Sequence, residues 1–379
     1  MKIEAISYDT GKPVKIEISG DKITKIKNTG RSNAPLLYVA PGLIDIQING
    51  YMGVDFSDQG LTPEMLRSAV EALWAQGVTT ILPTVITASP ENLLNSFKLL
   101  AEALTDQKTA LTVPGFHLEG PYLSPEKGFR GAHLEKYIRN PDWAEFTALQ
   151  AASGNRIKIV TIAPETDGAL SFIHNCAQSG VLVSLGHHNG NMEQITMATD
   201  AGARLSTHLG NGCANLIDRH NNPIWPQLSE DRLSISIIAD GFHLNRQEVR
   251  TFYKAKGTEK VILVSDALDL AGMPPGEYLR SERKVLLTKD VVKFPDENVL
   301  AGAASPISAC VGNMMDFTNC SLSESISMAT INPAKLLGFH DRGELAEDKR
   351  ADLILFAIEN GKLIVYKTIL AGQVVYEKK

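Results

Sequence analysis

The sequence predicts an α/β fold: a (β/α)8 barrel of the TIM type with a small β-sandwich domain formed from both termini. In the middle of the chain, short apolar runs alternate with helix signals, which is typical of βαβ units and a parallel sheet. At each end, short alternating runs are separated by Gly, Asp and Asn, and neither end alone has enough strands to bury a sheet face. We therefore assign residues 1–40 plus 335–379 to the sandwich domain and residues 41–334 to the barrel.

The barrel prediction rests on eight candidate strands. They begin at Leu43, Val78, Val113, Ile157, Val181, Arg204, Ser234 and Val261. The runs TPE from Thr62 and SPE from Ser89 each predict a helix start, because Thr and Ser cap helices and Pro suits the first turn. An open doubly wound sheet would alternate in the same way, but no GxGxxG fingerprint follows any candidate strand. Residues 278–300 are expected to form an extra hairpin after the eighth strand.

Composition excludes several classes of protein. The 379 residues are 44% hydrophobic, enough for a large core, and carry a formal charge of -6, which argues against a nucleic-acid or anionic-membrane binder. The early residues hold no apolar segment of the kind a signal peptide needs, and no apolar run is long enough to span a membrane, so we expect a cytoplasmic protein. The four widely spaced cysteines are expected to be reduced thiols.

Reactive side chains fall at the carboxyl ends of the candidate strands, which form the active-site face of a barrel. Glu119 ends the third strand, His187 the fifth and His208 the sixth. One carboxylate and two imidazoles leave a coordination position open for water, as catalytic metal sites require. Each residue alone could be a buried, hydrogen-bonded polar group, but three at strand ends favour a metal site. We expect one divalent ion, with zinc first and iron, manganese or cobalt as alternatives, because nitrogen and oxygen ligands accept all four.

Two further positions shape the chemistry. Asp266 lies in the apolar run VILVSDA, where an unpaired carboxylate would be costly to bury. The burial of this carboxylate would be explained if Asp266 acts beside the metal, first as a general base and then as a general acid. The structural alternative is that Asp266 forms an ion pair or caps a helix. On the first strand, Gln47 and Asn49 stand where many barrel metallohydrolases carry two histidines for a second metal. Amides bind transition metals poorly, so we predict one metal rather than two.

Several motifs together carry a family resemblance. They are APGLIDIQINGYMGVDF, GFHLEGPYLSPEKGFRGAH, VTIAPE, GHHN, THLGNG, IADGFH, VSDA, LAGAA and INPAKLLGF. In order and spacing they resemble the N-acetylglucosamine-6-phosphate deacetylase family of the amidohydrolase superfamily. The resemblance implies a barrel with a sandwich from both termini, a homodimer, a metal held by Glu119, His187 and His208, and Asp266 as the catalytic acid and base.

The resemblance also implies residues that contact the sugar and its phosphate. They are Ala132, His133, Asn211, Gly212, Arg219, His243, Leu300, Ala301 and Gly302. His133 is expected to donate to the acetyl carbonyl oxygen as charge develops there, with a plain substrate hydrogen bond as the alternative. Arg219 could grip the phosphate through paired hydrogen bonds, within its own subunit or across a dimer, or be a solvated surface residue.

The implied reaction is the hydrolysis of N-acetylglucosamine 6-phosphate to glucosamine 6-phosphate and acetate, with no organic cofactor. The loop after THL departs from the family, which more often has Asn-Ala-Met where this chain has Asn211, Gly212 and Cys213. Because that loop abuts the sugar, N-acetylgalactosamine 6-phosphate is an alternative substrate. Another barrel amidohydrolase acting on a different amide is the second alternative. A silent sugar-phosphate sensor is the third, and the presence of Asp266 argues against it because a sensor needs no general base.

Overall fold

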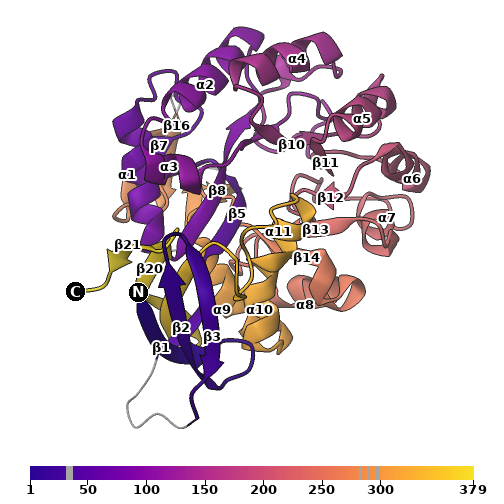
Figure 1. Cartoon of the computed structure of the whole chain (residues 1–379). Helices are drawn as coiled ribbons and strands as arrows, with labels where there is room; N and C mark the ends of the chain where they lie inside the picture. Colours follow the sequence, from indigo (N-terminus) through magenta and orange to yellow (C-terminus); the bar gives the residue numbers. More distant parts are fainter. Residues whose placement is uncertain (31–36, 281–282, 289–290, 296–298) are drawn as a thin grey trace.

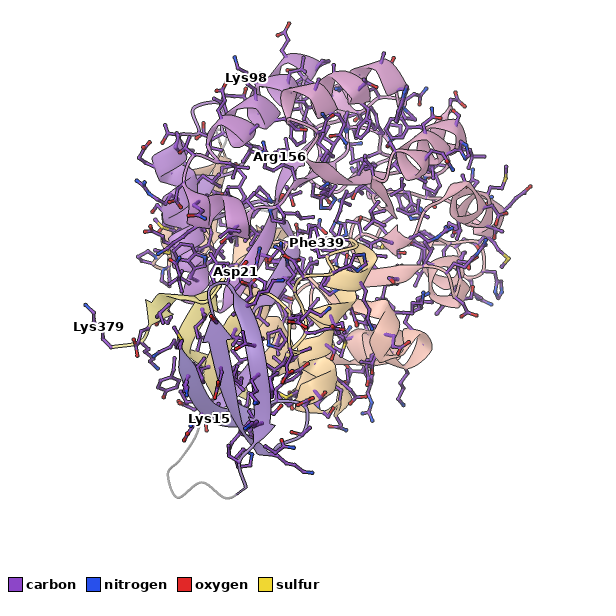
Figure 2. The ribbon with its side chains drawn as sticks, in the orientation of Figure 1. Lys15, Asp21, Lys98, Arg156, Phe339 and Lys379 are labelled. Carbon is purple, nitrogen blue, oxygen red and sulfur yellow. The ribbon has the colours of Figure 1, made fainter. Side chains whose placement is uncertain are left out.

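The computed structural model describes all residues except 31–36, 281–282, 289–290 and 296–298. A ring of helices surrounds a central set of strands, and a separate β unit lies at the end of the molecule where both termini are found (Figure 1). The side chains fill the space between these layers (Figure 2).

The central sheet has the strand order β14-β13-β12-β11-β10-β9-β8-β5, with parallel neighbours throughout. Its strands are β5 (Leu43–Ile48), β8 (Val78–Ile86), β9 (Phe116–Glu119), β10 (Ile157–Ile162), β11 (Leu182–Leu185), β12 (Leu205–Ser206), β13 (Ser234–Ile237) and β14 (Val261–Leu263). The first and last strands are joined beyond the end of β14, because the amide of Asp266 donates to Gln47 O at 2.9 Å and the amide of Asn49 donates to Ala267 O at 2.8 Å. The predicted (β/α)8 barrel is therefore confirmed.

Helices cover the outside of the barrel. They are α1 (Pro63–Trp74), α2 (Pro90–Glu102), α3 (Gln107–Thr112), α4 (Trp143–Ala152), α5 (Ala169–Gln178), α6 (Met192–Ala201), α7 (Ile224–Ser229), α8 (Arg246–Lys256), α9 (Ile307–Thr318), α10 (Leu322–Met328) and α11 (Ile331–Leu336), with short 3-10 turns at Glu135–Tyr137 and Thr258–Lys260. The expected starts are found: Thr62 accepts from the amide of Met65, and Ser89 accepts from that of Asn92. In the described part of the chain, no helix has the length and apolar character needed to cross a membrane.

Both ends of the chain build one sheet, in the order β21-β20-β19-β4-β1-β2-β3. Its strands are β1 (Lys2–Ser7), β2 (Pro13–Ser19), β3 (Lys22–Asn28), β4 (Tyr38–Pro41), β19 (Leu353–Glu359), β20 (Lys362–Leu370) and β21 (Gln373–Glu377). Strand β4 connects the two ends, because it pairs with β1 on one side and with β19 on the other. The two termini thus form a shared β unit, as expected from the sequence.

A four-stranded antiparallel sheet follows β14, where the sequence predicted a single hairpin. It comprises β15 (Gly276–Arg280), β16 (Arg283–Leu287), β17 (Val291–Phe294) and β18 (Val299–Ala303), while a small hairpin of β6 (Gly50–Tyr51) and β7 (Val54–Asp55) follows β5. The last strand returns to the barrel, since the amide of Leu268 donates to Ala303 O at 3.0 Å. Each of the four strands has only four or five residues, which explains why two of them were missed.

Candidate active site

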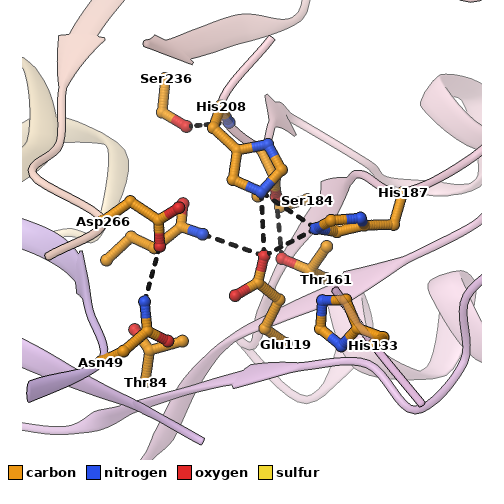
Figure 3. Close-up of polar contacts among 12 residues, drawn as sticks. Asn49, Thr84, Glu119, His133, Thr161, Ser184, His187, His208, Ser236 and Asp266 are labelled. Atoms are coloured by element: carbon orange, nitrogen blue, oxygen red, sulfur yellow. Dashed lines mark hydrogen bonds and ion pairs between the residues drawn. The ribbon is translucent and has the colours of Figure 1, made fainter. Parts of the chain in front are cut away.

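Three side chains meet at the carboxyl end of the barrel (Figure 3). Glu119 Oε1 lies 3.2 Å from His187 Nε2 and 3.0 Å from His208 Nε2, and the two nitrogens are 3.1 Å apart. All three residues are buried. Glu119 is the last residue of β9, whereas the histidines lie just past the ends of β11 and β12.

The hydrogen position on His187 and the pKa of His208 both favour a cation at the centre of this cluster. His187 Nδ1 lies 3.1 Å from Phe129 O, and a carbonyl only accepts, so in the neutral ring Nδ1 carries the hydrogen and Nε2 presents a lone pair. Burial alone would lower the pKa of His208, but the hydrogen bond to Glu119 and its charge raise it, so the cluster attracts positive charge. Two ligand atoms that each lie about 2.0–2.1 Å from a tetrahedral ion are about 3.4 Å from one another. The three atoms of the cluster, now 3.0–3.2 Å apart, would therefore need to move only slightly outward to hold a metal.

Amides at the end of the first strand contact both carboxylates of the site. Gln47 Nε2 donates to Glu119 Oε1 at 3.0 Å, and Asn49 Nδ2 donates to Asp266 Oδ1 at 2.7 Å. From the sequence, Gln47 and Asn49 are predicted only to be poor ligands for a second metal. The structure adds that each amide is a hydrogen-bond donor to a reactive group.

Asp266 lies three residues beyond β14 and is half-buried. Burial, together with the charge of Glu119, raises its pKa to about 6, although His208, His243 and Asn49 act in the opposite direction. A carboxyl with a pKa near the working pH can both take and return a proton. This environment suits an acid and base better than a structural ion pair.

The backbone at three of these residues is unusual. His187, His208 and Asp266 have φ values of +52°, +31° and +49°. Positive φ is uncommon for residues other than glycine and occurs often at functional sites. The sequence predicted these residues as strand ends, whereas the structure places them in the turns that follow.

His133 lies beside the three-residue cluster. Its ring packs edge-on against that of His187, with centroids 4.4 Å apart, and its Nδ1 lies 2.8 Å from Thr87 Oγ1. Burial lowers the pKa of His133 to about 3, so the ring is neutral at physiological pH and its Nε2 is the nitrogen left for other contacts. Glu119, His133 and His187 each offer a ligand atom within 4.8 Å of the others, but the tighter contacts favour His208 as the third ligand.

Two glycines fix the position of His187. A Cβ on Gly131 would lie 2.8 Å from Cε1 of this ring, and one on Gly212 would lie 2.6 Å from its Nδ1. Both glycines also have positive φ. Gly212 was predicted to contact substrate, and the structure shows that it packs directly against the imidazole.

A chain of hydrogen bonds lies in the barrel beneath the cluster. His117 Nδ1 is 3.1 Å from Ile46 O, which can only accept, so the neutral ring accepts at Nε2 from Thr161 Oγ1 at 2.8 Å. Thr161 in turn accepts from Thr207 at 2.8 Å, and Thr207 accepts from Ser184. The Ile46 carbonyl thus determines which group donates and which accepts in every one of these hydrogen bonds. The series of bonds connects β9, β10, β11 and the residue after β12.

His243 and Asn211 also lie close to the cluster. The His243 Nδ1 is 2.7 Å from Asp240 Oδ2, and Asp240 also accepts from the amides of Phe242 and His243. Sequence reasoning missed Asp240, although an Asp three residues before a functional His was a usable signal. The amide of Asn211 donates to His208 O at 2.9 Å, and its Nδ2 is buried without a partner among the residues that the structure describes.

Other predicted substrate residues are less closely grouped. Leu300, Ala301 and Gly302 lie on β18, where Gly302 packs against Leu268, although the side chain of Ala301 is outside the described set. Ala132 is exposed next to His133. Arg219 is exposed on the loop before α7, and no partner for its guanidinium is found among the described residues.

A hollow of about 370 Å³ lies between the loops near the cluster. Phe129, whose carbonyl contacts His187, lines it together with Glu126, Asn189, Asn191, Leu216, Ile217, Asp218 and Asn221. The hollow thus reaches the residue that orients a ligand of the cluster.

A model of the amidohydrolase family matches residues 38–375. The chain belongs to the amidohydrolase family. An N-acetylglucosamine-6-phosphate deacetylase of Lysinibacillus sphaericus is 31% identical over 337 residues, covering 89% of this chain and 85% of that protein. An N-acetylgalactosamine-6-phosphate deacetylase of Escherichia coli O157:H7 is 32% identical over 336 residues, covering 88% and 87%.

Solved structures of members of this family resemble the chain over its whole length. An N-acetylglucosamine-6-phosphate deacetylase from Thermotoga maritima has a TM-score of 0.88 at 30% identity and covers 100% of both chains. A mutant of the Mycobacterium smegmatis enzyme in complex with N-acetyl-D-glucosamine-6-phosphate has a TM-score of 0.87 at 28% identity and covers 99% of both.

Proposed function

We propose that this amidohydrolase removes the acetyl group from N-acetylglucosamine 6-phosphate, giving glucosamine 6-phosphate and acetate. The observation that carries the proposal is the meeting of Glu119, His187 and His208 beside Asp266, in a chain whose relatives are deacetylases of amino-sugar phosphates. A binding protein would not need a carboxyl with a raised pKa at this place.

Glu119, His187 and His208 would hold one divalent metal ion, which when bound lowers the pKa of a water and polarises a carbonyl. Asp266 takes the proton of the attacking water. The neutral ring of His133 donates from Nε2 to the acetamide oxygen as negative charge develops there. Asp266 then returns its proton to the departing amine, which balances the hydrolysis.

The remaining residues of the resemblance would hold the sugar and its phosphate. Asn211 supports this assignment because its Nδ2 is buried and has no hydrogen-bond acceptor among the described residues. Arg219 suits the phosphate, since a guanidinium forms paired charge-assisted hydrogen bonds, and its exposure fits a role across a homodimer. Ala132, Gly212, His243 and the β18 segment Leu300, Ala301 and Gly302 complete the set.

We infer zinc as the metal in the cell, with iron, manganese and cobalt as alternatives that the same ligands accept. The four unpaired cysteines fit a reducing, cytoplasmic location. We also propose domain boundaries at residues 1–40 plus 335–379 for the β domain and 41–334 for the barrel. The division of the strands into two large sheets supports them, although β4 of the shared sheet extends to Pro41.

N-Acetylgalactosamine 6-phosphate is the second candidate substrate. The Escherichia coli relative that acts on this epimer is as similar to the chain as the glucosamine-type relatives are. The loop from Asn211 to Cys213 departs from the pattern expected for the gluco-type family and lies next to His208.

The test is acetate release from both phosphorylated epimers and from unphosphorylated N-acetylglucosamine, with the metal content of the protein measured first. We expect fast release from a phosphorylated sugar with about one metal per chain, as a three-ligand site with an open position requires. Absence of release from all three substrates by the metal-loaded protein would refute the proposal and favour a different amide.

A further inference from the structure

Gln47 lies on β5, and Asn49 is the first residue beyond the end of that strand. Both side chains are buried, with exposed fractions of 1% and 6%. Their backbones carry the bonds that close the barrel, since Gln47 O accepts from the amide of Asp266 and the amide of Asn49 donates to Ala267 O. The segment that holds the amides is therefore fixed directly to the one that holds the catalytic acid and base.

The contact between Asn49 and Asp266 acts on one oxygen of the carboxylate. Nδ2 of Asn49 donates to Oδ1 of Asp266 at 2.7 Å, and this charge-assisted hydrogen bond makes Oδ1 the less basic of the two oxygens. The other oxygen, Oδ2, is left to take the proton of water. Charge-assisted hydrogen bonds of this kind also favour the ionised form of the carboxylate.

The contact between Gln47 and Glu119 acts on the metal-ligand cluster instead. Nε2 of Gln47 donates to the same Oε1 that faces His187 and His208. A carboxylate oxygen has two lone pairs, so Oε1 can accept from the amide and still offer one to an ion. Hydrogen bonds of this kind orient metal ligands in many sites.

We propose that the two amides are positioning residues with separate roles: Asn49 directs the proton to Oδ2 of Asp266, and Gln47 orients Glu119 towards the two histidines. The Asn49 role rests on the proposed function, whereas the Gln47 role concerns metal binding alone. Together the two amides hold both carboxylates of the site in place by hydrogen bonding.

The experiment compares Asn49→Leu with Gln47→Met, which remove the donors at similar size. Asn49→Leu should lower kcat about 10–100-fold, in the range of lost positioning contacts, with KM within about two-fold and metal affinity unchanged. Because the lost donor favoured the ionised carboxylate, the acid limb of the kcat profile should move to higher pH. Gln47→Met should weaken metal affinity about 10–100-fold, measured by competition with a chromophoric chelator, and leave the acid limb in place once saturated.

A matched control is a buried hydrogen bond to Ile48, the residue between the two amides in the sequence. Thr84→Val on β8 removes the hydroxyl that accepts from the amide of Ile48 at 3.0 Å, and no hydrogen bond to either carboxylate is lost. This variant should shift neither the acid limb nor the metal affinity. The titratable groups facing Asp266 are Glu119, His208, His243 and Asp45, and all are unchanged in the variants.

Several outcomes would overturn the proposal. One is a normal kcat and acid limb in Asn49→Leu, and another is normal metal affinity in Gln47→Met. If both variants lose kcat and metal affinity alike, the amides have no separate roles. Should Asn49→Leu fail to fold, Asn49→Ala removes the same donor with less bulk. The metal-affinity measurements need no substrate, so they test Gln47 even if the wild-type protein proves to act on another amide.

Discussion

Replacing Gly212 by alanine should damage the metal centre through packing alone. The new Cβ would lie 2.6 Å from His187 Nδ1, and ordinary contacts begin at 3.4 Å, so the ring must move by about 0.8 Å. That movement also disrupts the bond from Nδ1 to Phe129 O at 3.1 Å. Loss of such an orienting contact typically lowers metal affinity about 10–100-fold, and we expect at least that. Alanine at a φ of +62° adds a backbone cost of about 1–2 kcal/mol.

The assay is competition between the protein and a chelator for zinc, together with the thermal unfolding midpoint. Gly11→Ala is the matched control, because Gly11 has a φ of +64° and its Cβ would meet nothing within 4 Å. Both variants should lose similar stability from the backbone, but only Gly212→Ala should lose metal affinity. Wild-type affinity in Gly212→Ala would show that the ring is not confined as the structure indicates.

Four further predictions follow from the site. Asp266→Asn should abolish turnover while substrate still binds, as calorimetry can show, and normal turnover would refute its assigned role. With a pKa of about 6, Asp266 loses its charge as pH falls, so kcat should decline below about pH 6; a flat profile would contradict this. Thr161→Val leaves His117 Nε2 without a donor and should cost about 2 kcal/mol in unfolding free energy, measured with urea. Thr87→Val should lower kcat and Thr87→Ser restore it, because the hydroxyl holds His133 at Nδ1; equal kcat in both would refute this.

The fold was largely predictable because its signals are local. Each of the eight barrel strands begins within three residues of its predicted start, since apolar runs and caps such as Thr62 and Ser89 are local in the sequence. The sheet of β15 to β18 was underestimated because its strands have only four or five residues each. The order in which β4 joins the two ends was also invisible, because strand pairing is a long-range property.

The site was predictable in its residues and not in its contacts. Strand ends of a parallel barrel converge, so Glu119, His187 and His208 could be grouped from the sequence. The donors Gln47 and Asn49 could not be paired with their carboxylates, because each pair spans more than 70 residues of chain. Positive φ at non-glycine residues leaves no mark in the sequence, so the turns that aim the histidines were unexpected.

The left-handed backbone at His187, His208 and Asp266 has a consequence for protein engineering. Glycine at any of these positions would relieve about 1–2 kcal/mol of steric strain against an entropic cost of about 0.5–1 kcal/mol. The side chains outweigh that small gain, because glycine would leave the buried partners Glu119 or Asn49 without their hydrogen bonds. A search for stabilising glycine substitutions that used φ alone would therefore choose these three positions wrongly.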